Sequence, residues 1–285
     1  MPKANPDRLF VAHKPAGIGS NRFLGQIKRK YGVKKAGFSG TLDPFASGVL
    51  IMAFGKYTKL FRFLKKAPKS YRATLWLGAY SETLDIEKIS EVATLPPFHE
   101  TAIEDALMQL GGEITYLPPK YSAKKIDGKR AYALMRNNEA VTMREVTSFV
   151  HEIRLLHYRH PFVTFEVTVS EGTYVRSLGE MIARKLGCDG ALSMLERLHE
   201  GAFYYEEEKA LDPLAYLDME ENFYLADHED LKLGRKLRVT DFQKQNEAIY
   251  LVQYDTHFAI IEIRDGLVKY LLNGVNYADI VKKER

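Results

Sequence analysis

The most informative segment of the chain covers residues 37–50 and reads GFSGTLDPFASGVL. Glycines stand at its first, fourth and twelfth positions, and Asp43 is its only acid. The segment leads into the apolar run Val49–Met52. A glycine-punctuated loop therefore carries a single carboxylate beside a strongly apolar stretch.

The charge around Asp43 is strongly positive. Residues 1–72 contain 16 Lys and Arg but only two acids, Asp7 and Asp43, although the whole chain has a net charge of only +4. A basic surplus confined to one part of a chain is typical of a polyanion-binding face. A carboxylate in such a face repels phosphates, so its presence favours a chemical role. The alternative is an Asp that caps the turn at Pro44, and the residues alone leave both open.

Length and composition predict a globular protein. The chain has 285 residues, enough for one large and one small domain, and 46% of them are hydrophobic, enough for a real core. No apolar run approaches the ~20 residues that span a bilayer. The N-terminal residues lack the pattern of a signal peptide. We therefore expect a cytoplasmic protein that does not enter a membrane.

Several kinds of chemistry are excluded by the sequence. Cys188 is the only cysteine, which rules out an internal disulfide and a cysteine zinc cluster. The histidines at 151, 157 and 160 match no common metal signature. Residues 48–56 end in Gly-Lys, but the glycines are seven apart and an aromatic residue follows where Ser or Thr should bind magnesium. We expect neither a metal nor a cofactor.

Hydrophobic periodicity predicts mixed secondary structure. It predicts helices at 20–32, at 101–110 and after Gly172, and strands at 70–77, 163–170 and within 249–272. Ser20 is the expected N-cap of the first helix and Gly32 its end, and Thr101 with Glu104 has the spacing of a capping box. Asp265-Gly266 predicts a tight hairpin turn. Without regular βαβ alternation, the pattern favours an α+β fold.

Five further motifs accompany the 37–50 segment. They are Lys14-Pro15-x-Gly17 with Ser20; Lys69-Ser70-Tyr71 leading into Leu77-Gly78; Pro118-Pro119-x-Tyr121-Ser122-Ala123-x-Lys125 with Gly128 and Ala131-Tyr132; Gly172-Thr173-Tyr174-Val175-Arg176-Ser177-Leu178; and Leu195-x-Arg197 before Gly201. All six, in this order, resemble the motifs of the tRNA pseudouridine synthase B family. The resemblance spans residues 9–203.

This resemblance implies a fold and a domain organisation. The expected fold is a pseudouridine-synthase-like mixed, mainly antiparallel sheet with flanking helices, in a catalytic domain at residues 1–210. Residues 118–150 resemble an insertion that grips RNA. Residues 211–285 would form a small β-rich, RNA-binding-like appendage.

The resemblance also implies a reaction. Members of the family isomerise uridine to pseudouridine at position 55 in the T-loop of tRNA. The uridine is flipped out of the loop, its glycosidic bond breaks, and C5 of the uracil bonds to C1′. The expected partner is the T-arm of tRNA, bound by a monomer, and no cofactor is needed.

Each role is carried over from the matching motif. Asp43, Tyr71 and Arg176 are the expected catalytic residues: the carboxylate that acts at the ribose, the tyrosine that stacks on the uracil, and the arginine that pairs with the aspartate. Expected substrate-binding residues are Phe38, Tyr174, Leu195 and Lys14. Expected contacts to the RNA backbone are Lys28, Arg29, Lys30, Lys124 and Lys125.

Two departures from the family pattern affect substrate fit. Phe38 replaces the usual histidine, and Lys88 replaces a glycine that follows the motif Ser81–Asp85. Two rival functions also remain: a non-catalytic RNA-binding protein that keeps the fold, and the catalytic subunit of a guide-RNA particle. The intact set of Asp43, Tyr71 and Arg176 argues against the first. The weakly basic C-terminal part argues against the second.

Overall fold

A computed structural model describes residues 7–122, 125–126, 129–130 and 143–277. The strands of the large sheet are β1 (Arg8–Lys14), β2 (Ala36–Ser39), β3 (Ser47–Phe54), β4 (Lys69–Leu77), β7 (Gly112–Tyr116), β10 (Val146–Arg159), β11 (Phe162–Val169), β12 (Gly190–Glu200) and β13 (Ala210–Leu211). The C-terminal sheet contains β14 (Glu220–Glu221), β15 (Ala248–Tyr254), β16 (His257–Arg264) and β17 (Leu267–Asn276). Two short pairs are β5 (Ala79–Ser81) with β6 (Ile89–Val92), and β8 (Lys125–Ile126) with β9 (Lys129–Arg130).

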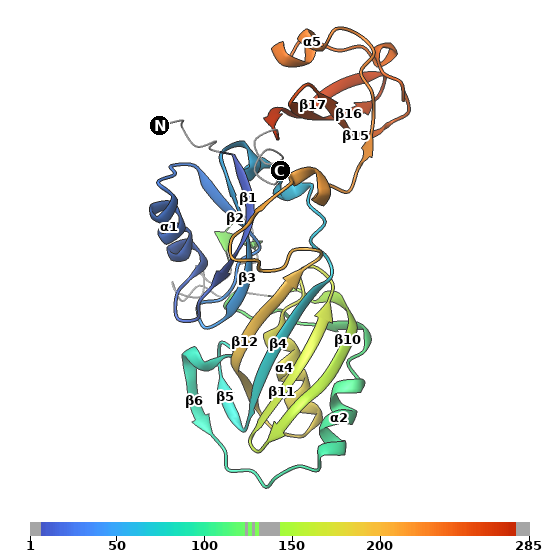
Figure 1. Ribbon diagram of the computed structural model, residues 1–285. Coiled ribbons are helices and arrows are strands. Elements are labelled where there is room, and N and C mark those ends of the chain that lie inside the picture. The colour runs from blue at the N-terminus through green and yellow to red at the C-terminus, as the bar shows by residue number, and fades with distance from the viewer. Residues whose placement is uncertain (1–6, 123–124, 127–128, 131–142, 278–285) are drawn as a thin grey trace.

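The α-helices are α1 (Ser20–Tyr31), α2 (Glu100–Met108), α4 (Val175–Lys185) and α5 (His228–Leu233). Among the described residues, helices α1, α2 and α4 lie beside the large sheet, and α5 lies at the C-terminal sheet (Figure 1). The 3-10 helices are η1 (Gly55–Arg62), η2 (Ile86–Lys88), η3 (Pro213–Tyr216) and η4 (Val239–Asp241). No helix in the described part of the chain is long and apolar enough to cross a membrane.

The topology confirms the predicted fold class. Strands of the large sheet follow the order β13-β1-β3-β12-β4-β11-β10-β7, with β2 beside β3. Among the described strands of this sheet, only β3 and β12 pair in parallel. Helices α2 and α4 pack on the half that contains β4, β10 and β12, and α1 packs beside β2. The fold is α+β with a mainly antiparallel sheet.

The alternation of apolar and polar residues in β4 and β11 arises, as predicted, because one face of each strand is buried. Tyr71, Ala73 and Leu75 of β4 are buried, whereas the intervening side chains are only half-buried. Strand β11 repeats this pattern, so the apolar faces of both strands point to the same core beneath α2 and α4. This core forms one wall of the site described below.

Strands β1 and β3 are buried on both faces, which explains the continuous apolar run in β3. One face, with Leu50 and Met52, packs under α1. The other, with Val49 and Ile51, packs against η1 and the C-terminal sheet. A strand covered on both faces has no solvent side and therefore no polar alternation.

The C-terminal sheet shares this second core with the large sheet. Its predicted hairpin is confirmed, because Asp265 and Gly266 both have positive φ, 52° and 70°, between β16 and β17. Its other face packs against α5 and the segment that follows α5. The division of the chain into domains at residue 210 remains a prediction.

Two predicted helix caps were wrong. The α1 helix begins at Ser20, but its N-cap is Gly19, and Ser20 points elsewhere. Gly32 ends this helix in the left-handed conformation, as expected. The α2 helix begins one residue before Thr101, where the N–H of Ala102 already donates to the carbonyl of His99. Thr101 is therefore inside the first turn and cannot cap it.

Candidate active site

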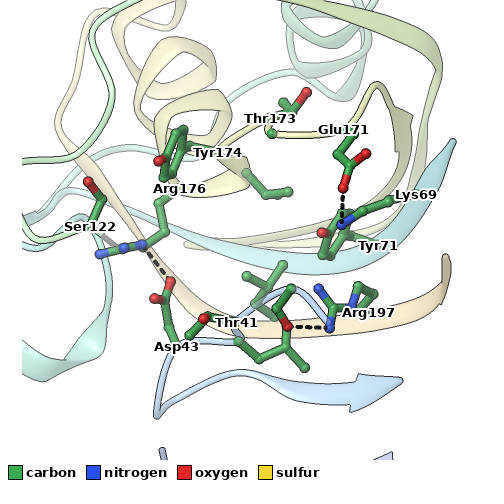
Figure 2. A pocket seen from close by; sticks show the side chains of 15 residues that line it. Thr41, Asp43, Lys69, Tyr71, Ser122, Glu171, Thr173, Tyr174, Arg176 and Arg197 are labelled. Carbon is green, nitrogen blue, oxygen red and sulfur yellow. Dashed lines mark hydrogen bonds and ion pairs between the residues drawn. The ribbon is translucent and has the colours of Figure 1, made fainter. Parts of the chain in front are cut away.

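A cavity of about 290 Å³ lies where the 37–50 segment meets β4, β12 and the start of α4 (Figure 2). Its lining residues are Gly40, Thr41, Leu42, Asp43, Lys69, Tyr71, Ser122, Glu171, Gly172, Thr173, Tyr174, Val175, Arg176, Leu195 and Arg197. Five of the predicted site residues are among them: Asp43, Tyr71, Tyr174, Arg176 and Leu195. The fold thus gathers residues of several sequence motifs around one cavity.

Buried polar groups hold the Asp43 loop in place. The hydroxyl of Ser20 bonds to both polar groups of Leu42, at 2.9 Å from its carbonyl oxygen and 3.0 Å from its nitrogen. The N–H of Gly17 donates to the carbonyl of Pro44 at 2.8 Å. Asp43 lies between Leu42 and Pro44, so the loop has little freedom to move the carboxylate.

Arg197 fixes the same loop at its two ends. Its Nε donates to the carbonyl of Val49 at 2.8 Å and its Nη2 to the carbonyl of Gly40 at 3.2 Å. Gly48 has φ +109°, and a Cβ on it would lie 2.2 Å from the carbonyl oxygen of Arg197. A side chain at position 48 would therefore push β12 away from the loop.

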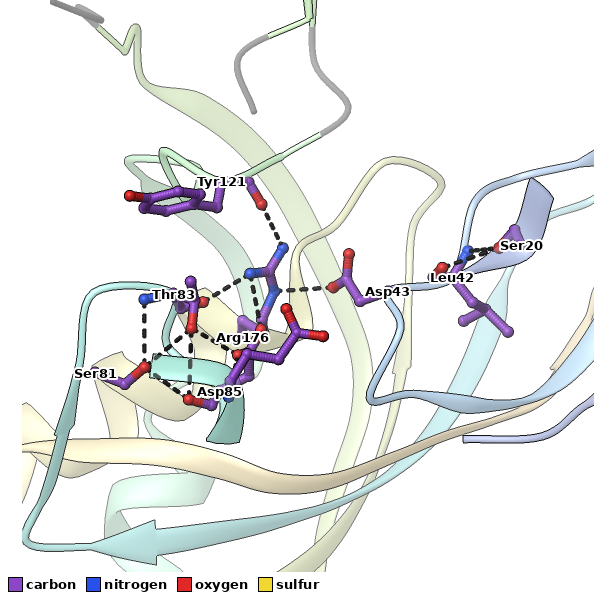
Figure 3. A network of polar contacts seen from close by, with 9 residues as sticks. Ser20, Leu42, Asp43, Ser81, Thr83, Asp85, Tyr121 and Arg176 are labelled. Carbon is purple, nitrogen blue, oxygen red and sulfur yellow. Dashed lines mark hydrogen bonds and ion pairs between the residues drawn. The ribbon is translucent and has the colours of Figure 1, made fainter. Parts of the chain in front are cut away.

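The guanidinium of Arg176 is 5% exposed and joins two carboxylates (Figure 3). Its Nε lies 2.9 Å from Oδ2 of Asp43, and its Nη1 lies 3.1 Å from Oδ2 of Asp85. Its donors also bond to the carbonyls of Thr83 at 2.6 Å and Tyr121 at 2.9 Å. These contacts set the plane of the guanidinium before any substrate binds.

Asp43 has an unusual electrostatic environment. Burial raises the pKa of its carboxyl above the ordinary 3.8, Arg176 lowers it, and the nearby charge of Asp85 raises it again. The net direction of the pKa shift is upward. Asp43 therefore loses its negative charge at a higher pH than an exposed aspartate does.

Asp85 is a site residue that the sequence reasoning noted only as part of a motif. It is 2% exposed, and its Oδ1 accepts hydrogen bonds from Oγ1 of Thr83 at 2.6 Å and from the N–H of Glu87 at 3.0 Å. A buried carboxylate held by neighbouring donors is suited to orient Arg176. The clue in the sequence was the Ser81–Asp85 segment, which keeps most of the family pattern.

Apolar and aromatic side chains form the walls of the cavity. Tyr71 is 7% exposed and lies opposite Arg197 across the β4–β12 pairing. Leu195, on the same face of β12, is 5% exposed. Tyr174 stands at the start of α4, and burial raises the pKa of its hydroxyl. A flat base could stack between such walls.

Two predicted substrate-binding residues do not line the cavity. Lys14 is fully buried, and its Nζ donates to the carbonyls of Pro15 and Ile18 at 2.9 and 2.7 Å. Burial lowers its pKa to about 8. Phe38 lies in β2 opposite Met52 and packs on the cluster beneath α1. Both were assigned by motif position, both support the strands that flank the loop, and their contacts with RNA stay predictions.

The structure describes only some of the residues predicted to contact the RNA backbone. Lys28, Arg29 and Lys30 form the last turn of α1, where Arg29 is exposed. Nζ of Lys30 lies 2.6 Å from a carboxylate oxygen of Glu208, which also accepts from the hydroxyl of Tyr31. Lys30 is therefore partly neutralised. Lys124 lies outside the described residues, and only the strand position of Lys125 in β8 is described.

The sequence matches one family model and resembles named relatives over most of its length. The model for "TruB family pseudouridylate synthase (N terminal domain)" matches residues 28–175. A protein named tRNA pseudouridine synthase B from a Sulfurovum species is 52% identical over 269 residues, which cover 94% of this chain and 97% of the relative. The protein of the same name from a Nitratiruptor species is 54% identical, with 94% and 98% covered.

The chain belongs to the TruB family of pseudouridylate synthases.

Similar folds among solved structures agree with this membership. A chain in the crystal structure of a Cbf5-Nop10-Gar1 complex superposes with a TM-score of 0.65, at 22% identity, over 93% of this chain and 85% of that chain. At this identity the similarity concerns the fold alone. In this TruB-family protein, the loop with Asp43, the strand with Tyr71 and the helix with Arg176 meet at one cavity.

Proposed function

We propose that this chain isomerises uridine to pseudouridine at position 55 in the T-loop of tRNA. The observation that carries the proposal is the contact of 2.9 Å between Asp43 and Arg176 at a cavity that Tyr71 also lines. The names of the relatives support tRNA as the substrate. The position in the T-loop rests on the resemblance of the motifs.

The proposed reaction needs a flipped nucleotide. The uridine leaves its stack at a cost of a few kcal/mol, which contacts in the pocket offset. Its N1–C1′ bond then breaks, the uracil turns within the cavity, and a C5–C1′ bond forms. C5 loses one proton and N1 gains one, so the product is an isomer of the substrate.

Asp43 is proposed to act at the ribosyl centre. Two roles fit its position: attack on C1′ as a nucleophile, or removal of the proton on C2′. Each requires the ionised carboxylate. Arg176 favours that ionised form. The hydrogen bonds from Ser20 and Arg197 to the loop restrict the position of the carboxylate in the cavity.

Tyr71 is proposed to stack on the uracil and to assist loss of the C5 proton. Its ring belongs to the core beneath α4, and its residue also lines the cavity. The strand thus presents a rigid flat surface to the base. Leu195 and Tyr174 would complete the pocket around it.

Incubation with an unmodified tRNA transcript, followed by mapping of pseudouridine along the RNA, tests this proposal. We expect pseudouridine at position 55 with the native chain and none with Asp43→Asn. An RNA-binding protein without catalytic activity would bind the transcript and leave every uridine unchanged. Modification at other positions alone would refute the T-loop assignment.

A further inference from the structure

The cavity has a second charged end, opposite the one formed by Asp43 and Arg176 (Figure 2). Lys69 lines this end and is 8% exposed, and its Nζ lies 2.9 Å from Oε2 of Glu200. Glu200 is fully buried, and its Oε1 lies 2.9 Å from Nη2 of Arg197. Two cations are thus fixed at the cavity wall by one carboxylate behind them.

Glu171 faces the same end from the solvent side. Its Oε1 lies 3.8 Å from Nζ of Lys69 and 3.6 Å from Nζ of Lys66. Both distances exceed those of a hydrogen bond, and the side chain is 54% exposed. Exposed ion pairs of this kind contribute little to stability. Glu171 is therefore a loosely held anion, in contrast to Glu200.

The surroundings of Glu171 favour an anion. Apart from Glu171, the ion pairs of Lys66, Lys69 and Arg197 among the described residues involve only the single charge of Glu200. Gly40 lies against this charged end of the cavity. A Cβ at position 40 would lie 3.4 Å from charged atoms of Lys69, Arg197 and Glu200, so the absence of a side chain leaves space beside them. A phosphate oxygen can approach ammonium groups at about 2.7–2.9 Å, closer than Glu171 does.

We propose that Glu171 occupies, in the free protein, the place of one phosphate of the bound RNA, and that the incoming phosphodiester displaces it. The inference rests on the proposed function, since a nucleotide held at Asp43 brings its own phosphates to the rim of the cavity. Lys66 and Lys69 then exchange a weak carboxylate partner for a phosphate. RNA that seats no phosphate there meets the negative charge of Glu171 instead, so this residue makes binding more selective.

The test compares Glu171→Gln with Glu196→Gln. Glu196 lies on β12 between Leu195 and Arg197 and does not line the cavity, so its substitution makes the same change in charge away from the proposed phosphate position. Both variants and the parent carry Asp43→Asn to prevent turnover. Dissociation constants are measured at low salt for a T-arm stem-loop, and for two stem-loops with one neutral methylphosphonate linkage 5′ or 3′ of the target uridine.

We expect Glu171→Gln to bind the unmodified stem-loop about two- to fivefold more tightly, as the loss of one screened repulsion permits. This gain should disappear with one of the two methylphosphonate RNAs and be absent in Glu196→Gln. An equal gain on all three RNAs, an equal gain in Glu196→Gln, or no gain would overturn the inference. Each readout is binding, so the proposed isomerisation, which pseudouridine mapping tests, would stand or fall independently.

Discussion

Asp43 and Asp85 both contact one guanidinium, that of Arg176, at 2.9 and 3.1 Å. The two carboxylates differ in their surroundings: the Asp43 side chain is 34% exposed at the cavity, whereas that of Asp85 is 2% exposed behind it. One arginine thus connects the proposed reacting group to a buried anchor.

Replacing Arg176 by alanine should abolish turnover and destabilise the protein. Removal of the cation leaves Asp85 as an unpaired buried charge, which costs about 3–5 kcal/mol. Denaturant unfolding and single-turnover assays on tRNA measure the two effects. Arg184→Ala, on the exposed side of the same helix, is the control and should change stability by no more than about 0.5 kcal/mol. An unchanged free energy of unfolding in Arg176→Ala would mean that its contacts with Asp43 and Asp85 do not stabilise the protein.

The pH dependence of the reaction should follow the ionisation of Asp43. The proposed reaction requires the ionised carboxylate, so the rate should fall as pH drops through a pKa that lies above the ordinary 3.8. The charge of Asp85 raises that pKa. Asp85→Asn should therefore move the acid limb of the single-turnover profile to lower pH, whatever it does to the maximal rate.

An exposed carboxylate nearby provides the control for that profile. Glu82 is 59% exposed and does not line the cavity with Asp43, so Glu82→Gln should leave the acid limb in place. A shift to higher pH in Asp85→Asn would contradict the electrostatic account of the pair.

Ser20→Ala should slow the reaction more than it weakens binding. The hydroxyl holds both polar groups of Leu42, the residue before Asp43. Its removal leaves a buried N–H and a buried carbonyl without this partner, at a cost of about 1–3 kcal/mol. Single-turnover rates and dissociation constants on the same tRNA separate the two effects, and Ser20→Thr, which retains a hydroxyl, should recover part of the rate. Equal loss of both in the two variants would refute a positioning role.

Salt dependence should distinguish the basic residues of α1. Each phosphate contact contributes somewhat less than 1 to the slope of log affinity against log salt, about 0.7 for single strands and about 0.9 for B-form DNA. Arg29→Gln should reduce that slope, and Lys30→Gln should reduce it less, because Lys30 is already paired with Glu208. Filter binding over a range of salt concentrations measures both slopes. If neither slope changed, the end of α1 would not contact RNA.

Local patterns were sufficient to predict the elements but not the contacts between them. Strand β4 and helix α1 follow from periodicity, which depends only on neighbouring residues. The role of Ser20 was missed because its hydroxyl bonds to Leu42, 22 residues away, rather than to the start of its own helix. Lys14 and Phe38 lie outside the cavity lining, because motif position does not show which face of a strand points to a cavity, and their contacts with RNA stay predictions.

The candidate site shows the same limit. The isolated acid in a basic region indicated Asp43, and the motifs indicated Arg176 and Tyr71. Lys69 was noted only as part of a motif, and Glu171 and Glu200 gave no local signal, since their charges come together only when β4, β12 and the loop before α4 are adjacent. Pairing between distant strands therefore determined the part of the cavity that the sequence did not reveal.

The most direct test of the account is the single-turnover rate of pseudouridine formation at position 55 in unmodified tRNA, measured for the native chain, Asp43→Asn and Asp43→Glu. Binding of the same tRNA and thermal unfolding are measured in parallel. We expect product only from the native chain, with tRNA affinity in Asp43→Asn equal to or higher than native, because a repulsive charge has been removed from a basic face. Measurable pseudouridine from folded Asp43→Asn would contradict the central claim.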